Sequence, residues 1–123
     1  MYDLNKSQIM ELFQFDNAAK VISAAYIASS SGNVQTGDVV HLSFPGSNGD
    51  CHVKSGHINN AESYVIKIAS GFYDNPSKGL PSSNGMMLAF SASTGEPKAI
   101  LRDEGWLTDM RTCLLYTSPS PRD

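Results

Sequence analysis

The stretch CHVKSGHINNAESYVIKIAS, residues 51–70, decides the fold of this chain. The segments on either side of its Asn-Asn-Ala-Glu run contain Val, Ile and Tyr, residues that strands favour. Asn-rich runs of this length are typical of turns. Two strands joined by so short a connection run antiparallel. The stretch therefore predicts a β-hairpin at the centre of the molecule.

Further strands lie on both sides of this hairpin. The segment 39–44 (VVHLSF) is separated from residue 51 by a Gly/Asn-rich turn, which predicts a second hairpin. Residues 86–92 (MMLAFSA) and 98–103 (KAILRD) are separated by STGEP, another turn sequence. Between residues 70 and 85 lies a long Gly- and Pro-rich loop, and loops of this length are often functional. We expect about five strands in meander order.

Helical patterns occur at the two ends of the chain. Apolar residues recur at helical spacing in the first 30 residues, which predicts two helices before the first strand. Near the other end, residues 105–112 (GWLTDMRT) predict a turn and a helix with Thr108 as its N-cap. The predicted fold class is α+β, with N-terminal helices followed by a mostly antiparallel sheet.

Length, charge and composition exclude several classes. A chain of 123 residues is at most one domain. The net charge of −3 argues against a nucleic-acid-binding surface, and no apolar run is long enough to span a membrane. The N-terminus does not have the pattern of a signal peptide, and two cysteines do not form a disulfide framework. These features predict a cytoplasmic protein.

The character of the sequence changes after Thr112. Residues 113–123 (CLLYTSPSPRD) place Ser-Pro-Ser-Pro ten residues after Thr108, the predicted start of a helix. These eleven residues also resemble a translated sequencing adapter. We therefore interpret 113–123 as a non-native tail, and the alternative is a genuine disordered tail.

Three kinds of residue are candidates for binding. Lys67 alternates with apolar neighbours in its strand, so it lies either on a solvated face or in a pocket where its ammonium meets an anion; Lys54 has the same two interpretations. Arg111 falls in the first turn of a predicted helix, where a cation is unfavourable unless it binds an anion. The segment 79–85 (GLPSSNG) offers hydroxyl and backbone N–H groups. The three histidines lack metal-ligand spacing within any one element, so we predict no metal site.

Taken together, five motifs resemble the ornithine cyclodeaminase/mu-crystallin family. They are HVKSG (52–56), YVIKIASGFYDN (64–75), GLPSSNGMMLAF (79–90), TGEP (94–97) and DEGWLTDMRT (103–112). The resemblance covers residues 36–112 clearly and the N-terminal helices loosely. It implies a homodimeric, two-domain enzyme in which a Rossmann domain holds NAD. Residues 1–112 would then be a partial substrate-binding and dimerisation domain, from which the Rossmann part is missing.

The resemblance also implies roles for individual residues. Lys67 matches the family lysine that contacts the substrate carboxylate. Arg111 matches an arginine close to both substrate and cofactor, and Ser82 falls where the family has a small residue near the nicotinamide. His41 stands where several members have a substrate-binding arginine, and this departure leaves the substrate open. The acidic proton donor belongs to the missing domain, so no catalytic residue is expected in this chain.

The function implied by the resemblance is hydride transfer from the α-carbon of an amino acid to NAD, giving an imine, with loss of ammonia. This fragment would be inactive alone. An alternative is a non-catalytic small-molecule binder of the mu-crystallin type, which the histidine at position 41 keeps open. A third interpretation is a self-contained α+β binding module.

Overall fold

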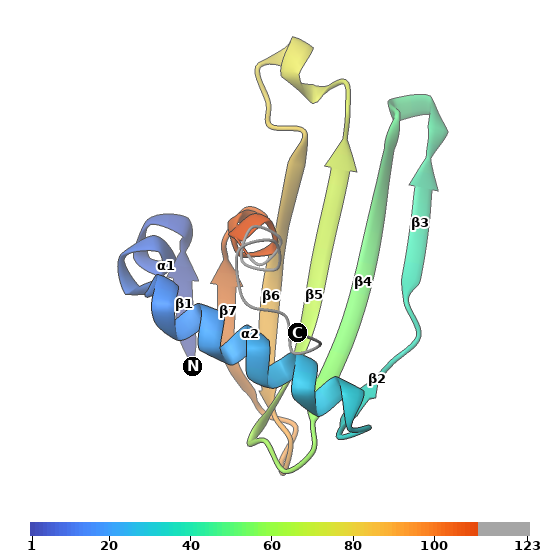
Figure 1. Ribbon diagram of the computed structural model, residues 1–123. Coiled ribbons are helices and arrows are strands. Elements are labelled where there is room, and N and C mark those ends of the chain that lie inside the picture. The colour runs from blue at the N-terminus through green and yellow to red at the C-terminus, as the bar shows by residue number, and fades with distance from the viewer. Residues whose placement is uncertain (111–123) are drawn as a thin grey trace.

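The computed structural model describes residues 1–110, apart from the side chains of Phe15, Ala19, Ser23 and Tyr26. A seven-stranded sheet dominates the fold (Figure 1). In chain order the elements are β1 (Tyr2–Asn5), α1 (Lys6–Leu12), α2 (Phe15–Ser30), β2 (Val34–Thr36), β3 (Val40–Phe44), η1 (Pro45–Ser47), β4 (Gly49–Ile58), β5 (Ser63–Phe72), η2 (Asn75–Lys78), β6 (Ser83–Ser91) and β7 (Pro97–Arg102), followed by a helical segment at 106–110.

The strand order is β1-β7-β6-β5-β4-β2, and β3 also pairs with β4. Strands β4 to β7 form an antiparallel meander, as the turn sequences predict. Strands β2 and β3 pair with the two ends of β4, also antiparallel. The mixed α+β class with a mostly antiparallel sheet is therefore confirmed.

The expectation that helices come first is wrong. Strand β1 precedes α1 and pairs with β7 in parallel, so that Asp3 lies opposite Ile100. The guanidinium of Arg102 donates two hydrogen bonds to the carboxylate of Asp3, with distances of 2.8 and 3.2 Å. A strand of four residues has too short a pattern to recognise, and its partner lies almost a hundred residues away. The first helix then begins after Asn5, which forms a capping box with Gln8.

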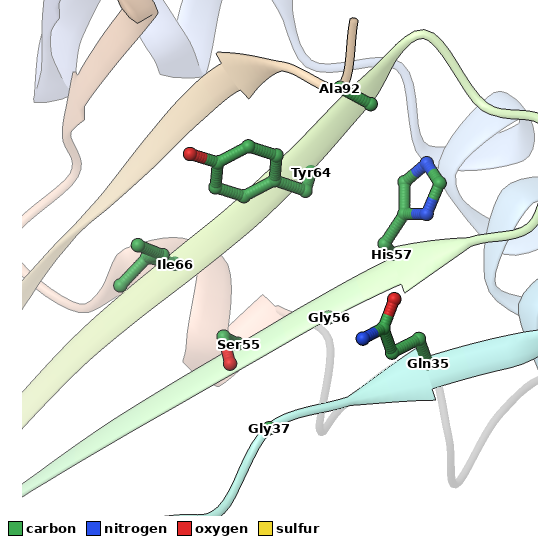
Figure 2. Close-up of a pocket in the computed structure, with 8 residues that line it drawn as sticks. All are labelled: Gln35, Gly37, Ser55, Gly56, His57, Tyr64, Ile66 and Ala92. Atoms are coloured by element: carbon green, nitrogen blue, oxygen red, sulfur yellow. The ribbon is translucent and has the colours of Figure 1, made fainter. Parts of the chain in front are cut away.

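Alternation along β5 sorts its side chains onto the two faces of the sheet. Helix α2 crosses one face in front of the strands (Figure 1). Figure 2 looks at the other face, where Tyr64 and Ile66 point toward the viewer. Val65 and Lys67 therefore lie on the side that α2 crosses. We call the side that α2 crosses the α2 face, and the side shown in Figure 2 the open face.

The described residues leave much of the sheet half-buried rather than fully covered. Only Ile9 and Asp103 have buried side chains among them. Trp106, near the end of the described residues, packs edge-to-face on Phe13 with ring centroids 5.0 Å apart, so the tryptophan has a packing role. On the open face the edge-strand residue Leu42 is 52% exposed. Helix α2 therefore covers only part of one side of the sheet, and apolar surface is exposed on the other. None of these helices is long and hydrophobic enough to serve as a membrane span.

Candidate functional site

Two lysines face each other across the centre of the sheet. Lys67 in β5 is the direct partner of Lys54 in β4, and on its other side it pairs with Met87 in β6. Lys67 is half-buried, whereas Lys54 is exposed. Like charges directly opposite each other on one face of a sheet repel. The pair raises the positive potential on the α2 face, which favours an anion such as a carboxylate there.

Two histidines form the neighbouring row on the same face. His41 in β3 is the direct partner of His52 in β4, and His52 in turn pairs with Ala69, two residues from Lys67. The two imidazole rings stack with centroids 4.4 Å apart and an interplanar angle of 9°. His41, proposed from the sequence as a substrate contact, thus shares a face with Lys67. The histidine row lies about 7 Å along the strands from the lysine row.

A carboxylate completes the histidine cluster. The Nε2 atom of His41 lies 3.7 Å from Oδ2 of Asp50, which precedes His52 by two residues and shares its face. One ligand atom from each of the three side chains lies within 4.8 Å of the other two. The prediction of no metal site considered spacing within single elements, and it missed this cluster because the residues converge across two strands. The register of the β3–β4 hairpin is the signal that places His41 beside His52.

The other residues proposed from the sequence lie apart from this row or outside the described residues. Ser82 immediately precedes β6, and its backbone carbonyl accepts a hydrogen bond from the N–H of Phe72 at 2.7 Å. The neighbouring Ser83 pairs with Gly71, four residues beyond Lys67 and therefore about 13 Å along the strand. Ser82 and Lys67 would contact different parts of a ligand. Arg111 lies outside the described residues.

The open face carries a cavity that the sequence does not predict (Figure 2). It has a volume of about 530 Å³, and its lining residues are Gln35, Gly37, Ser55, Gly56, His57, Tyr64, Ile66 and Ala92. The Nε2 atom of His57 lies 2.9 Å from the carbonyl oxygen of Ala61. Because Tyr64 and Ile66 alternate with Lys67 along β5, this cavity is separated from the lysine pair by the thickness of the sheet.

Comparison with known proteins identifies the relatives of this chain. Residues 3–115 match the model of the Ornithine cyclodeaminase/mu-crystallin family. An uncharacterized cyclodeaminase from Sinorhizobium fredii is 39% identical over 111 residues, which are 89% of this chain and 34% of that protein.

Solved structures share the fold. An archaeal alanine dehydrogenase dimer with bound NAD superposes with a TM-score of 0.84 at 25% identity, over 94% of this chain and 34% of the dehydrogenase chain. The Δ1-pyrroline-2-carboxylate reductase of Thermococcus litoralis, in complex with NADH and L-proline, gives a TM-score of 0.87 at 24% identity, over 94% and 36% of the two chains. The chain spans about a third of the length of each of these relatives. Since the family match extends over most of its residues, the chain belongs to the ornithine cyclodeaminase/mu-crystallin family.

Proposed function

We propose that this chain is the substrate-binding part of an NAD-dependent enzyme that acts on an amino acid. The α-carbon of the amino acid transfers a hydride to NAD and the amine loses a proton, which gives an imine. Addition of water, or of a second amine of the substrate, to the imine carbon then releases ammonia. Family membership supports this function, and so does the likeness to a dehydrogenase that binds NAD. The observation that carries the proposal is the opposed pair of Lys67 and Lys54 on the α2 face.

In this proposal the half-buried lysine holds the substrate carboxylate. An ammonium in a partly desolvated position interacts more strongly with a carboxylate than one in bulk water does. Lys67 would receive the carboxylate, Lys54 would add to the positive potential, and Arg111 would complete the carboxylate site. His41 would contact a part of the substrate other than its carboxylate, from the neighbouring row. Fixing the carboxylate in this way orients the α-carbon for transfer.

The cofactor needs more protein than the described residues supply. NAD accepts the hydride, and its pyrophosphate is normally held by a glycine-rich turn between a parallel strand and a helix. Within residues 1–110 the parallel strand pair is β1–β7, and no glycine-rich turn links either strand to a helix in this way. These residues therefore do not fit the pyrophosphate. We propose that Ser82 and Arg111 approach only the nicotinamide end, and that the rest of NAD is bound outside this part of the chain.

The proposed quaternary state rests on the exposed apolar residues of the open face. Exposed apolar residues such as Val40 and Leu42 lie there, and covering them would be favourable. We propose a homodimer for the full-length protein, located in the cytoplasm. The 123-residue chain alone is expected to self-associate, and its sedimentation coefficient should rise with concentration. A strictly monomeric chain with a cooperative melt would favour the self-contained binding module instead.

The test of the function is an assay of the longer protein that contains residues 1–112. Turnover of a panel of α-amino acids in the presence of NAD is followed by ammonia release for the wild type, Lys67→Met and the matched control Lys54→Met. We expect Lys67→Met to lower kcat/KM by about 100-fold or more, because a charge contact in a partly buried site is lost. Lys54→Met should lower it by less than about fivefold because that side chain is exposed.

One outcome would reject the specific contact proposed for Lys67, and a second would reject the enzyme proposal. Equal losses in both lysine variants would show that general positive charge is sufficient, without a specific contact. Saturable binding of a small molecule without any ammonia release across the panel would favour the mu-crystallin-type binder. The 123-residue chain alone should neither bind NADH nor turn over amino acids.

A further inference from the structure

We propose that His41, His52 and Asp50 form a binding site for a divalent transition-metal ion on the α2 face. The site joins the edge strand β3 to β4, and it rests on the geometry of these side chains rather than on the proposed function. It uses two of the three histidines in the chain.

The backbone places the three side chains for this role. His41 and His52 are direct cross-strand partners, so their Cβ atoms lie about 4.5–5.5 Å apart. Asp50 lies two residues before His52 and therefore projects from the same face of β4. The carboxylate approaches His41 diagonally, at 3.7 Å from its Nε2 atom. Ligand atoms of two imidazoles and one carboxylate thus lie within 4.8 Å of one another, and the stacked rings must turn out of their parallel arrangement to face one ion.

The distances are close to those that a metal needs. Tetrahedral coordination with metal–nitrogen bonds near 2.05 Å requires ligand atoms about 3.3 Å apart. The three ligand atoms now lie within 4.8 Å of one another, so they must approach by at most about 1.5 Å. Rotations about side-chain bonds supply this movement without a backbone shift. The side chains of His41 and Asp50 are 49% and 31% exposed, which leaves room for rotation and gives an ion access from solvent.

The ligand types select the metal class. Two imidazole nitrogens and one carboxylate oxygen suit Zn²⁺, Ni²⁺ or Cu²⁺, whereas Mg²⁺ and Ca²⁺ prefer oxygen ligands throughout. Three protein ligands also leave a coordination position open to water or another small ligand. Cys51 lies between Asp50 and His52, but strand alternation directs it to the open face, so it is not a ligand.

The same three groups are less suited to an anion. Asp50 carries a negative charge at the rim of the histidine pair, and it would repel a bound carboxylate or phosphate. The two lysines that favour anions belong to the next row, about 7 Å along the strands. The α2 face therefore carries a cation site and an anion site side by side.

Metal titration of the tag-free 123-residue chain tests this site. Folding is first checked by circular dichroism, and Zn²⁺ and Ni²⁺ are then titrated by calorimetry. We expect one ion per chain. His41→Gln and His52→Gln should each weaken binding by about tenfold or more, since even the loss of an outer-shell group costs that much. Asp50→Asn should weaken binding as well.

The third histidine provides the matched control. His57 lies on the open face (Figure 2), and its Nε2 atom is 2.9 Å from the carbonyl oxygen of Ala61. His57→Gln should therefore leave the affinity within about twofold. Cu²⁺ bound to the wild type should show an electron paramagnetic resonance spectrum with coupling to two imidazole nitrogens, reduced to one in either His41→Gln or His52→Gln. The same spectra can be recorded on the longer protein if the variants of this chain fail to fold.

Three results would overturn the metal site. The first is the absence of saturable metal binding to the folded wild type. The close approach of His41 and Asp50 would then be a histidine–carboxylate contact and not part of a metal site. The second is an equal loss in His57→Gln, and the third is unchanged binding in urea. Because the readout is metal binding, it remains distinguishable from any failure of amino-acid turnover.

Discussion

Lys54 and Lys67 are direct cross-strand partners on the α2 face, and Lys54 is an exposed residue whereas Lys67 is half-buried. A sheet gains nothing in stability from such an arrangement, because like charges in directly opposed positions repel. In the proposed function, both charges attract the substrate carboxylate. This relationship connects the sheet register to the proposed carboxylate site.

Removing the exposed lysine should stabilise the unliganded chain. Lys54→Gln relieves the repulsion, and we expect the free energy of unfolding to rise by up to about 0.5 kcal/mol at low salt. Added salt should shrink the difference because it screens exposed charges. Urea unfolding at two salt concentrations measures this effect. A loss of stability, or a gain that salt does not change, would contradict the repulsion.

Asp103 caps the helical segment at 106–110 and is 1% exposed. Its Oδ2 accepts a hydrogen bond from the N–H of Leu107 at 2.8 Å, while Oδ1 is buried without a hydrogen-bond partner in the structure. We expect Asp103→Ala to lower the free energy of unfolding by about 1–2 kcal/mol through loss of the cap. Asp109→Asn, an exposed change in the same segment, is the control and should be nearly neutral. Equal urea midpoints for the two variants would rule out the capping role.

Gly85 marks a close approach between two strands. A Cβ atom at this position would collide with the backbone carbonyl oxygen of Ile68 in β5, whereas one at Gly46 would meet open space. Gly85→Ala should therefore lower the free energy of unfolding by about 1–3 kcal/mol. Gly46→Ala should change it little. Thermal melts of the two variants compare them directly, and an equally stable Gly85→Ala chain would show that the strands can move apart at little cost.

The ion pair between Asp3 and Arg102 ties β1 to β7. Hydrogen bonds from the guanidinium hold the pKa of the Asp3 carboxyl below its ordinary value. A depressed pKa means that the pair adds stability above the ordinary carboxyl pKa and loses it as the pH falls through the lower folded value. Nuclear magnetic resonance titration of Asp3 should show the depressed pKa, and Arg102→Gln should restore the ordinary one. An unchanged titration in that variant would mean that Arg102 is not the cause.

The sequence predicts the sheet better than it predicts its edges. The meander from β4 to β7 follows from local turns and from alternation. The same alternation places Lys67 and Ile66 on opposite faces of the sheet. Strands β1 and β2 escape prediction because each has three or four residues and a partner far along the chain. Their pairing is a tertiary effect without a local pattern.

The site shows the same division between local and non-local information. The pattern of β5 indicates a lysine among apolar neighbours, but its opposition to Lys54 depends on the register between strands. The cluster of His41, Asp50 and His52 likewise needs the β3–β4 register, so a search within single elements misses it. Thr108 is a typical N-cap residue, yet the helical segment begins earlier because Asp103 supplies the capping oxygen.

The most direct test of the carboxylate site is a crystal structure of the longer protein with NAD and an amino-acid substrate. The account predicts that the substrate carboxylate lies on the α2 face, with an oxygen within about 3 Å of Nζ of Lys67. A carboxylate seated instead on the open face, in the cavity beside Tyr64 and Ser55, would contradict it.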